Sequence, residues 1–135
     1  MSHRLVHFEI HVADEQKAMA FYKAVFGWEF QKWPIPKPDG TEEIYWGIIT
    51  GPKEEAGING GLVKRRGPAP AEGAGVNGYV CTMVVTDVDE AVAKALAAGA
   101  TIALPKFTIP GVGDMAYCKD IDGNIFGMHR DTTKG

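Results

Sequence analysis

The sequence has little cysteine, with only Cys81 and Cys118 among its 135 residues. Two cysteines are too few for a disulfide-dense scaffold, and this pair does not match the spacing of a zinc site. Because each lies within an apolar run, we expect both thiols to be buried. A chain of this length can bury a substantial core, so we expect hydrophobic packing rather than covalent cross-links to hold the fold.

The sequence also lacks an excess of positive charge and any long hydrophobic run. It has 14 Lys and Arg residues and 17 Asp and Glu residues, which gives a net charge of −3 and no basic field for nucleic acid. No segment approaches the roughly 20 apolar residues of a membrane span, and the start, MSHRLVHFEI, lacks the apolar centre of a signal peptide. We therefore expect a soluble, cytoplasmic protein with neither nucleic acid nor membrane as a partner.

The first half of the chain shows a strand, a helix and three further strands. Apolar and polar residues alternate over Leu5–Val12, which predicts a half-buried strand. Asp14 is a suitable N-cap for a helix over Glu15–Phe26, whose apolar residues recur at helical spacing before Gly27 ends it. The segments 28–33, 44–50 and 58–64 are predicted strands, and the proline-rich PIPKPDGTEE at 34–43 is a predicted loop.

The second half repeats this order after a segment, 65–78, that is rich in Gly, Pro and Ala and has no periodicity. Strands are predicted over 79–85, 101–107, 115–119 and 124–130. Asp87 and Glu90 are spaced as in a capping box before a helix that ends at Gly99. When Asp14 is aligned with Asp87, Gly61 aligns with Gly127. We therefore predict one domain, 1–135, built from a βαβββ unit at 4–64, a linker at 65–78 and a second unit at 79–131.

Such a repeat predicts an α+β fold in which two curved mixed sheets enclose a cleft. HFEIHVADEQKAMAFYKAVFGWEF, its echo VTDVDEAVAKALAAG and the closing DIDGNIFGMHR together resemble the vicinal oxygen chelate superfamily. That superfamily includes glyoxalase I, bleomycin resistance proteins and extradiol dioxygenases. The resemblance covers nearly the whole chain and implies the glyoxalase-like fold. It also implies a homodimer, because units of this family often pair.

The resemblance also implies four strand positions that carry metal ligands in metal-dependent members. In this chain they are His7, Val80, Gly61 and Gly127. Only His7 has a metal-binding side chain, whereas zinc, nickel or iron sites need three or four N, O or S ligands. We therefore predict no metal site and no cofactor, and a divalent metal is disfavoured. A glyoxalase I or extradiol dioxygenase mechanism is disfavoured for the same reason.

Strand alternation predicts which other side chains share the face of His7. Glu9 and His11 follow it in the first strand, and Gly127 and His129 lie on the corresponding face of the last strand. Imidazole titrates near neutral pH, which makes His7 and His129 candidates for proton transfer, and the carboxylate of Glu9 is a candidate general base. These three residues are the catalytic candidates. Gly61 and Gly127 leave space for the body of a ligand, and aromatic rings supply contact area. The candidate ligand-binding residues are His11, Trp46, Thr82, Tyr117, Gly61 and Gly127.

These features leave three functions open. The first is a glyoxalase-like protein that binds a small organic molecule in the cleft and transforms it in a lyase or isomerase reaction. The second is a protein that sequesters a drug or metabolite, as bleomycin resistance proteins do. The third is a regulatory domain without turnover. A convergent group of His7, Glu9 and His129 would favour chemistry, whereas a wide aromatic cleft would favour capture.

Overall fold

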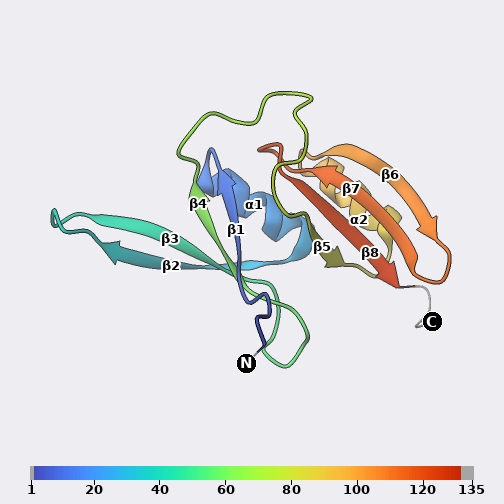
Figure 1. The fold of residues 1–135 in the computed structure, drawn as a ribbon, viewed down its shortest axis with the longest axis horizontal. Coiled ribbons are helices and arrows are strands. Elements are labelled where there is room, and N and C mark those ends of the chain that lie inside the picture. Colours follow the sequence, from blue (N-terminus) through green and yellow to red (C-terminus); the bar gives the residue numbers. More distant parts are fainter. Residues whose placement is uncertain (1, 132–135) are drawn as a thin grey trace. The chain divides into compact units, whose positions relative to one another are not determined.

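The computed structural model describes residues 2–131, which form two compact units that divide between Pro68 and Ala69. Each unit contains one helix and one four-stranded mixed sheet, in the chain order βαβββ (Figure 1). The predicted α+β class and the tandem βαβββ order are confirmed. The predicted boundaries of one domain with a linker, and the cleft between its two sheets, stay predictions.

Unit 1 comprises β1 (Phe8–Val12), α1 (Glu15–Phe26), β2 (Glu29–Pro36), β3 (Glu42–Ile49) and β4 (Gly60–Lys64). Its strands lie in the order β1-β4-β3-β2, with β1 and β4 parallel and the other neighbours antiparallel. The β2–β3 ribbon is longer than the part of β3 that pairs with β4, and its outer end projects beyond the sheet (Figure 1).

Unit 2 comprises β5 (Cys81–Val84), α2 (Val88–Ala97), β6 (Thr101–Ile109), β7 (Gly113–Lys119) and β8 (Ile125–Asp131). The order β5-β8-β7-β6 repeats that of unit 1, again with one parallel pair, β5 and β8. Glu9 pairs with Gly61 in unit 1, and Thr82 pairs with Gly127 in unit 2. The structural registers therefore match the alignment that the sequence repeat predicted.

Both helices begin at the predicted aspartates. The Asp14 carboxylate accepts a hydrogen bond from the Lys17 N–H at 3.0 Å, and the Asp87 carboxylate accepts one from the Glu90 N–H at 3.0 Å. Such a bond satisfies one of the amides that the first helical turn leaves free. Gly27 ends α1 with a left-handed φ of 73°, a conformation that suits glycine.

The core of each unit lies between its helix and one face of its sheet. In unit 1, Val12, Ile48 and Leu62 are almost fully buried, and the Tyr22 ring stacks on Trp28 with centroids 5.1 Å apart. In unit 2, Ala91 and Ala95 of α2 are buried, as are strand residues with side chains on one face: Ala116, Cys118, Phe126 and Met128. The opposite face of each sheet is its open face.

Two predictions about local structure were wrong. The segment 34–43 is not all loop, because β2 continues through Pro36 and β3 begins at Glu42. Pro34 and Pro36 are tolerated because β2 is an edge strand, where a missing N–H does not interrupt the sheet. Cys118 is buried as predicted, but Cys81 is exposed because it lies on the edge strand β5. No helix within residues 2–131 is both long and apolar enough to span a membrane.

Candidate functional site

The open face of unit 1 carries a hydrogen-bonded chain of four polar side chains. The Tyr45 hydroxyl donates to Glu9 Oε2 at 3.2 Å and lies 2.8 Å from His7 Nε2. Since the only hydroxyl hydrogen is directed to Glu9, His7 must donate its Nε2–H to the Tyr45 oxygen. His11 Nε2 lies 2.8 Å from Glu9 Oε1 and donates to that carboxylate. We name these residues, His7, Glu9, His11 and Tyr45, the His–Glu–Tyr network.

Two glycines of unit 1 leave room on the open face for the rings of Trp33 and Tyr45. Gly61 and Gly47 are paired across β4 and β3, so two adjacent places on the open face lack a side chain. A Cβ on Gly61 would overlap the Tyr45 hydroxyl and lie 2.6 Å from its Cε1, and a Cβ on Gly47 would touch the Trp33 ring at 3.6 Å. The two rings therefore lie over the glycines, nearly parallel at 14°. The space expected over Gly61 for a ligand is filled by Tyr45.

Burial raises the pKa of the Tyr45 hydroxyl, and the negative charge of Glu9 and the hydrogen bond to it raise it further. Each influence favours the protonated, neutral phenol. Tyr45 therefore keeps its proton at neutral pH and acts in the network as a hydrogen-bond donor. Glu9 and His11 remain partly accessible, with 42% and 51% of their side-chain surfaces exposed.

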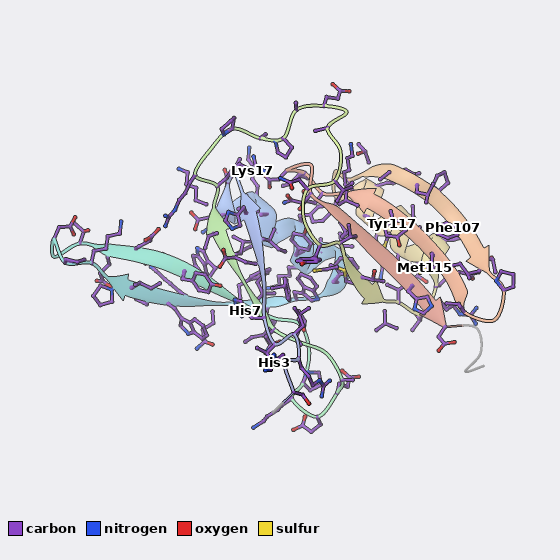
Figure 2. All side chains as sticks on the ribbon, in the orientation of Figure 1. His3, His7, Lys17, Phe107, Met115 and Tyr117 are labelled. Atoms are coloured by element: carbon purple, nitrogen blue, oxygen red, sulfur yellow. The ribbon has the colours of Figure 1, made fainter. Side chains whose placement is uncertain are left out.

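The open face of unit 2 brings Thr82, Gly127 and Tyr117 together. Gly127 pairs with Thr82 on one side and with Tyr117 on the other. A Cβ on Gly127 would lie 2.9 Å from both Thr82 Oγ1 and Tyr117 Cε1, so this glycine also lies against a tyrosine ring. The Phe107 ring is nearly parallel to Tyr117, and Figure 2 shows both side chains on neighbouring strands β6 and β7. The expected space over Gly127 is thus partly taken by Tyr117.

His129 lies next to Met115 in the pairing of β7 and β8. Its Nε2 atom is buried and has no hydrogen-bond partner among residues 2–131. A buried polar atom without a partner is uncommon in folded proteins. His7, Glu9 and His11 belong to unit 1 and His129 to unit 2, so the predicted convergence of His7, Glu9 and His129 stays a prediction.

An open apolar hollow of about 470 Å³ lies within unit 2. Its size falls in the range of small-molecule sites. Val76 and Leu104 are 60% and 47% exposed, although both side chains are apolar. Six residues line it: Val76, Val80, Ala103, Leu104, Tyr117 and Ile125. We refer to it as the apolar hollow.

A second hollow of unit 2, of about 310 Å³, is polar and lies at the N-terminal end of α2. Lys106 there forms an ion pair with Asp89 at 2.9 Å, and the hydrogen bond and charge of Asp89 raise the pKa of Lys106. Asp114 accepts a hydrogen bond from the Thr108 hydroxyl at 2.7 Å. These pairings describe a solvated, mixed-charge surface.

The structure does not fit the four-ligand metal site of metal-dependent relatives. Val80, Gly61 and Gly127 supply no ligand atom, and tyrosine rings lie against both glycines. Within residues 2–131, no group of three or more His, Cys, Asp or Glu side chains is arranged to hold a metal ion. Of the four positions, only that of His7, directly before β1 (Figure 2), carries a donor.

The predicted ligand-binding residues are distributed over both faces of the sheets. Thr82, Tyr117 and Gly127 adjoin one another, and His11 and Gly61 lie on the open face of unit 1. Trp46 pairs with the buried Leu62, on the opposite face from Gly61. The hydrogen-bonding role of Tyr45 and the part of Leu104 in the hollow were missed. The role of Tyr45 depends on β4 pairing with both β1 and β3, although the aromatic residues of β3 were a visible signal. The position of Leu104 depends on register shifts in the pairing of β6 with β7.

Comparison with known proteins finds a family model, curated relatives and solved structures that are similar to this chain. A family model, Bleomycin resistance protein-like N-terminal, matches residues 4–39. The curated protein CFP32 of Mycobacterium tuberculosis, which its name describes as a glyoxylase, is 28% identical over 125 residues, and the same match is found in Mycobacterium bovis. The alignment covers 89% of this chain but 42% of CFP32, so the chain spans about two fifths of that relative.

Solved structures share the fold at low sequence identity. A variant of the fosfomycin resistance protein FosX from Listeria monocytogenes, in complex with Mn(II) and 1S,2S-dihydroxypropylphosphonic acid, matches with a TM-score of 0.70 and 21% identity, over 99% of this chain and 94% of FosX. TnmS3, an antibiotic binding protein from Streptomyces sp. CB03234, matches with a TM-score of 0.65 and 24% identity, over 98% and 99% of the two chains.

A third similar structure is a glyoxalase/bleomycin resistance protein/dioxygenase family enzyme from Burkholderia phytofirmans PsJN. It matches with a TM-score of 0.65 and 22% identity, over 93% of this chain and 96% of that enzyme. Identities this low establish a common fold. They leave the ligand of this chain to be argued from its own residues.

Proposed function

Because the family model, the curated relative and the fold confirm the resemblance to the vicinal oxygen chelate superfamily, we propose that this chain binds a small organic molecule in the apolar hollow of unit 2. The observation that carries the proposal is the hollow itself, in which exposed apolar side chains adjoin the Tyr117 ring. Apolar side chains that stay in contact with water gain free energy when a ligand covers them.

The lining of the hollow favours capture over turnover. None of its six lining residues is a histidine, carboxylate, lysine or cysteine, so the hollow lacks the side chains that most often act as general acid or base. Tyr117 supplies ring area together with one hydroxyl, a combination suited to a mostly apolar ligand with a polar group. The similar fold of TnmS3, an antibiotic binding protein, supports the binding of a small molecule in general. Catalytic roles for His7, Glu9 and His129, homodimerisation and a cytoplasmic location stay predictions.

The proposal is tested with an uncharged aromatic fluorescent dye, N-phenyl-1-naphthylamine, and a pair of matched variants. Leu104 and Ile102 lie in the same strand, β6, and are 47% and 48% exposed, but only Leu104 lines the hollow. Leu104→Asp places a carboxylate against the bound dye and should weaken binding at least tenfold, because burying an unpaired charge is unfavourable. Ile102→Asp adds the same charge outside the hollow and should change the affinity less than twofold.

The measurement is the saturable rise in dye fluorescence, with circular dichroism confirming that both variants remain folded. Equal loss of affinity in the two variants would contradict a site at the hollow. Failure of the folded wild-type protein to bind the dye at all would contradict the proposal.

A further inference from the structure

A lysine lies on the open face of unit 2 next to the apolar hollow. Lys119 follows Tyr117 by two residues in β7, so the two side chains project from the same face of the sheet. Across the strands, Lys119 pairs with Ile125 of β8 and with Thr101 of β6. Tyr117 and Ile125 both line the hollow. Lys119 therefore adjoins the hollow along its own strand and across to the next one.

The positive charge of Lys119 is not neutralised by the protein. Its half-buried side chain forms no ion pair or hydrogen bond with any side chain between residues 2 and 131. The adjacent Asp120 is buried, and its carboxylate accepts hydrogen bonds from two backbone amides of the turn that follows β7. Asp131, which shares the open face, lies six residues from Ile125, about 20 Å along an extended strand. The ammonium is therefore left for a ligand to pair with.

We infer that the apolar hollow selects an anionic ligand, an apolar or aromatic molecule with one acidic group that pairs with the Lys119 ammonium. This inference rests on the proposed function, because it names the class of molecule that the same hollow binds. The apolar lining covers the body of the molecule, and Lys119 determines which polar group that molecule carries.

The surroundings of Lys119 favour such a pairing. An ion pair beside apolar side chains is stronger than one in bulk water, because the local dielectric constant is lower. Lysine is a compact cation on a flexible four-carbon stem, so its ammonium can follow an acidic group at the rim of the hollow. The net charge of −3 opposes anions at long range, so a preference for an anion has to come from a local cation.

Lys119 is separable from the apolar part of the site. It is not one of the six lining residues, so its replacement removes no apolar surface from the hollow. Replacing Lys119 should therefore change the affinity for an anionic ligand and leave that for a neutral ligand of the same shape. A residue that only supported the fold would change both affinities together.

The test compares two fluorescent dyes that differ by one charged group. 8-Anilinonaphthalene-1-sulfonate is N-phenyl-1-naphthylamine with a sulfonate added, so the neutral dye reports on the hollow and the anionic dye on the hollow together with Lys119. The ratio of the two dissociation constants should favour the anionic dye about fivefold more in the wild type than in Lys119→Met. This difference should shrink as the salt concentration rises from about 50 mM to about 500 mM.

Lys94→Met is the matched control, because it removes the same charge from α2, on the other face of the sheet. It should leave the ratio unchanged. Circular dichroism confirms folding, and Lys119→Gln is the second variant if Lys119→Met does not fold.

If the folded wild type bound neither dye, the proposed function would fail and this inference with it. If the neutral dye bound but the ratio were the same in the wild type and Lys119→Met, the inference alone would be overturned. An equal change in Lys94→Met would also overturn it, since the effect would then come from net charge.

Discussion

At the place where Glu9 adjoins Gly61 in unit 1, unit 2 has Thr82 beside Gly127. This single exchange accounts for much of the difference between the two open faces. The Glu9 carboxylate accepts hydrogen bonds from Tyr45 and His11 and organises a polar network. Unit 2 has no carboxylate at the equivalent position, and its Tyr117 ring borders the apolar hollow. One topology therefore presents a polar face in one unit and an apolar one in the other.

The helix-facing sides of the two sheets show a second exchange. In unit 1, Phe8 pairs with Gly60, and in unit 2 Cys81 pairs with Phe126. The large ring comes from the edge strand in unit 1 and from the inner strand in unit 2. Each ring thus pairs with a smaller residue. At the buried Gly60 of unit 1, the contact with Phe8 leaves no room for a side chain.

The largest effect should follow from filling the small member of this pair. In Gly60→Ala, the new Cβ would lie 2.5 Å from the Phe8 carbonyl oxygen and 2.7 Å from its ring. Because a backbone atom cannot rotate away, we expect the free energy of unfolding in urea to fall by about 1–3 kcal/mol. Gly67→Ala, with no atom within 4 Å of its Cβ, should change it by less than about 0.5 kcal/mol. Equal effects would refute the packing argument.

A smaller and symmetric effect is expected at the two helix caps. Asp14→Ala and Asp87→Ala each remove one side-chain hydrogen bond to a first-turn amide, which should lower the free energy of unfolding by about 1 kcal/mol. Hydrogen exchange should show faster exchange in Glu15–Phe26 for the first variant and in Val88–Ala97 for the second. If either substitution increased hydrogen exchange equally in both helices, the stabilisation by each cap would not be local to its own helix.

The smallest change in the free energy of unfolding is expected from the His–Glu–Tyr network, and it should appear at high pH. The raised pKa of Tyr45 means that the unfolded chain loses this proton at a lower pH than the folded protein. The Tyr45 hydroxyl makes its full contribution to the free energy of unfolding below the unfolded pKa of about 10. This contribution is lost as the pH rises through the higher folded pKa. Stability should therefore fall more between pH 9.5 and pH 11 in the wild type than in Tyr45→Phe.

Urea unfolding across this pH range is the measurement for that effect, and Tyr79→Phe is its control. The Tyr79 side chain is fully exposed, so its removal should leave the pH profile of the wild type unchanged. Identical profiles for the wild type and Tyr45→Phe would show that burial and Glu9 together do not stabilise the neutral phenol.

Local patterns were enough to predict the helices, their caps and the tandem repeat, because each depends on residues close together in the chain. The outer part of the β2–β3 ribbon was missed because Pro34 and Pro36 usually end a strand, and their acceptance depends on β2 being an edge. Alternation placed Glu9 and His11 on one face. It could not show that Tyr45 joins them, because that contact requires β4 to lie between β1 and β3.

The expectation of open space over Gly61 and Gly127 failed for a related reason. A glycine removes its own side chain, but a neighbouring ring then lies over it, and only the strand pairing identifies that ring. The apolar hollow was likewise beyond prediction, since its residues come from the segment before β5 and from β6, β7 and β8, and the pairing of β6 with β7 includes register shifts between Ile102 and Phe107 that the sequence pattern does not reveal.

The central claim, that unit 2 carries the ligand site, is tested most directly by amide chemical shifts of the isotopically labelled protein during titration with N-phenyl-1-naphthylamine. The account predicts saturable shifts concentrated around Val76, Val80, Leu104, Tyr117 and Ile125, with little change in β1 and β3. Shifts that were largest in the His–Glu–Tyr network of unit 1, or that rose without saturation across the chain, would contradict it.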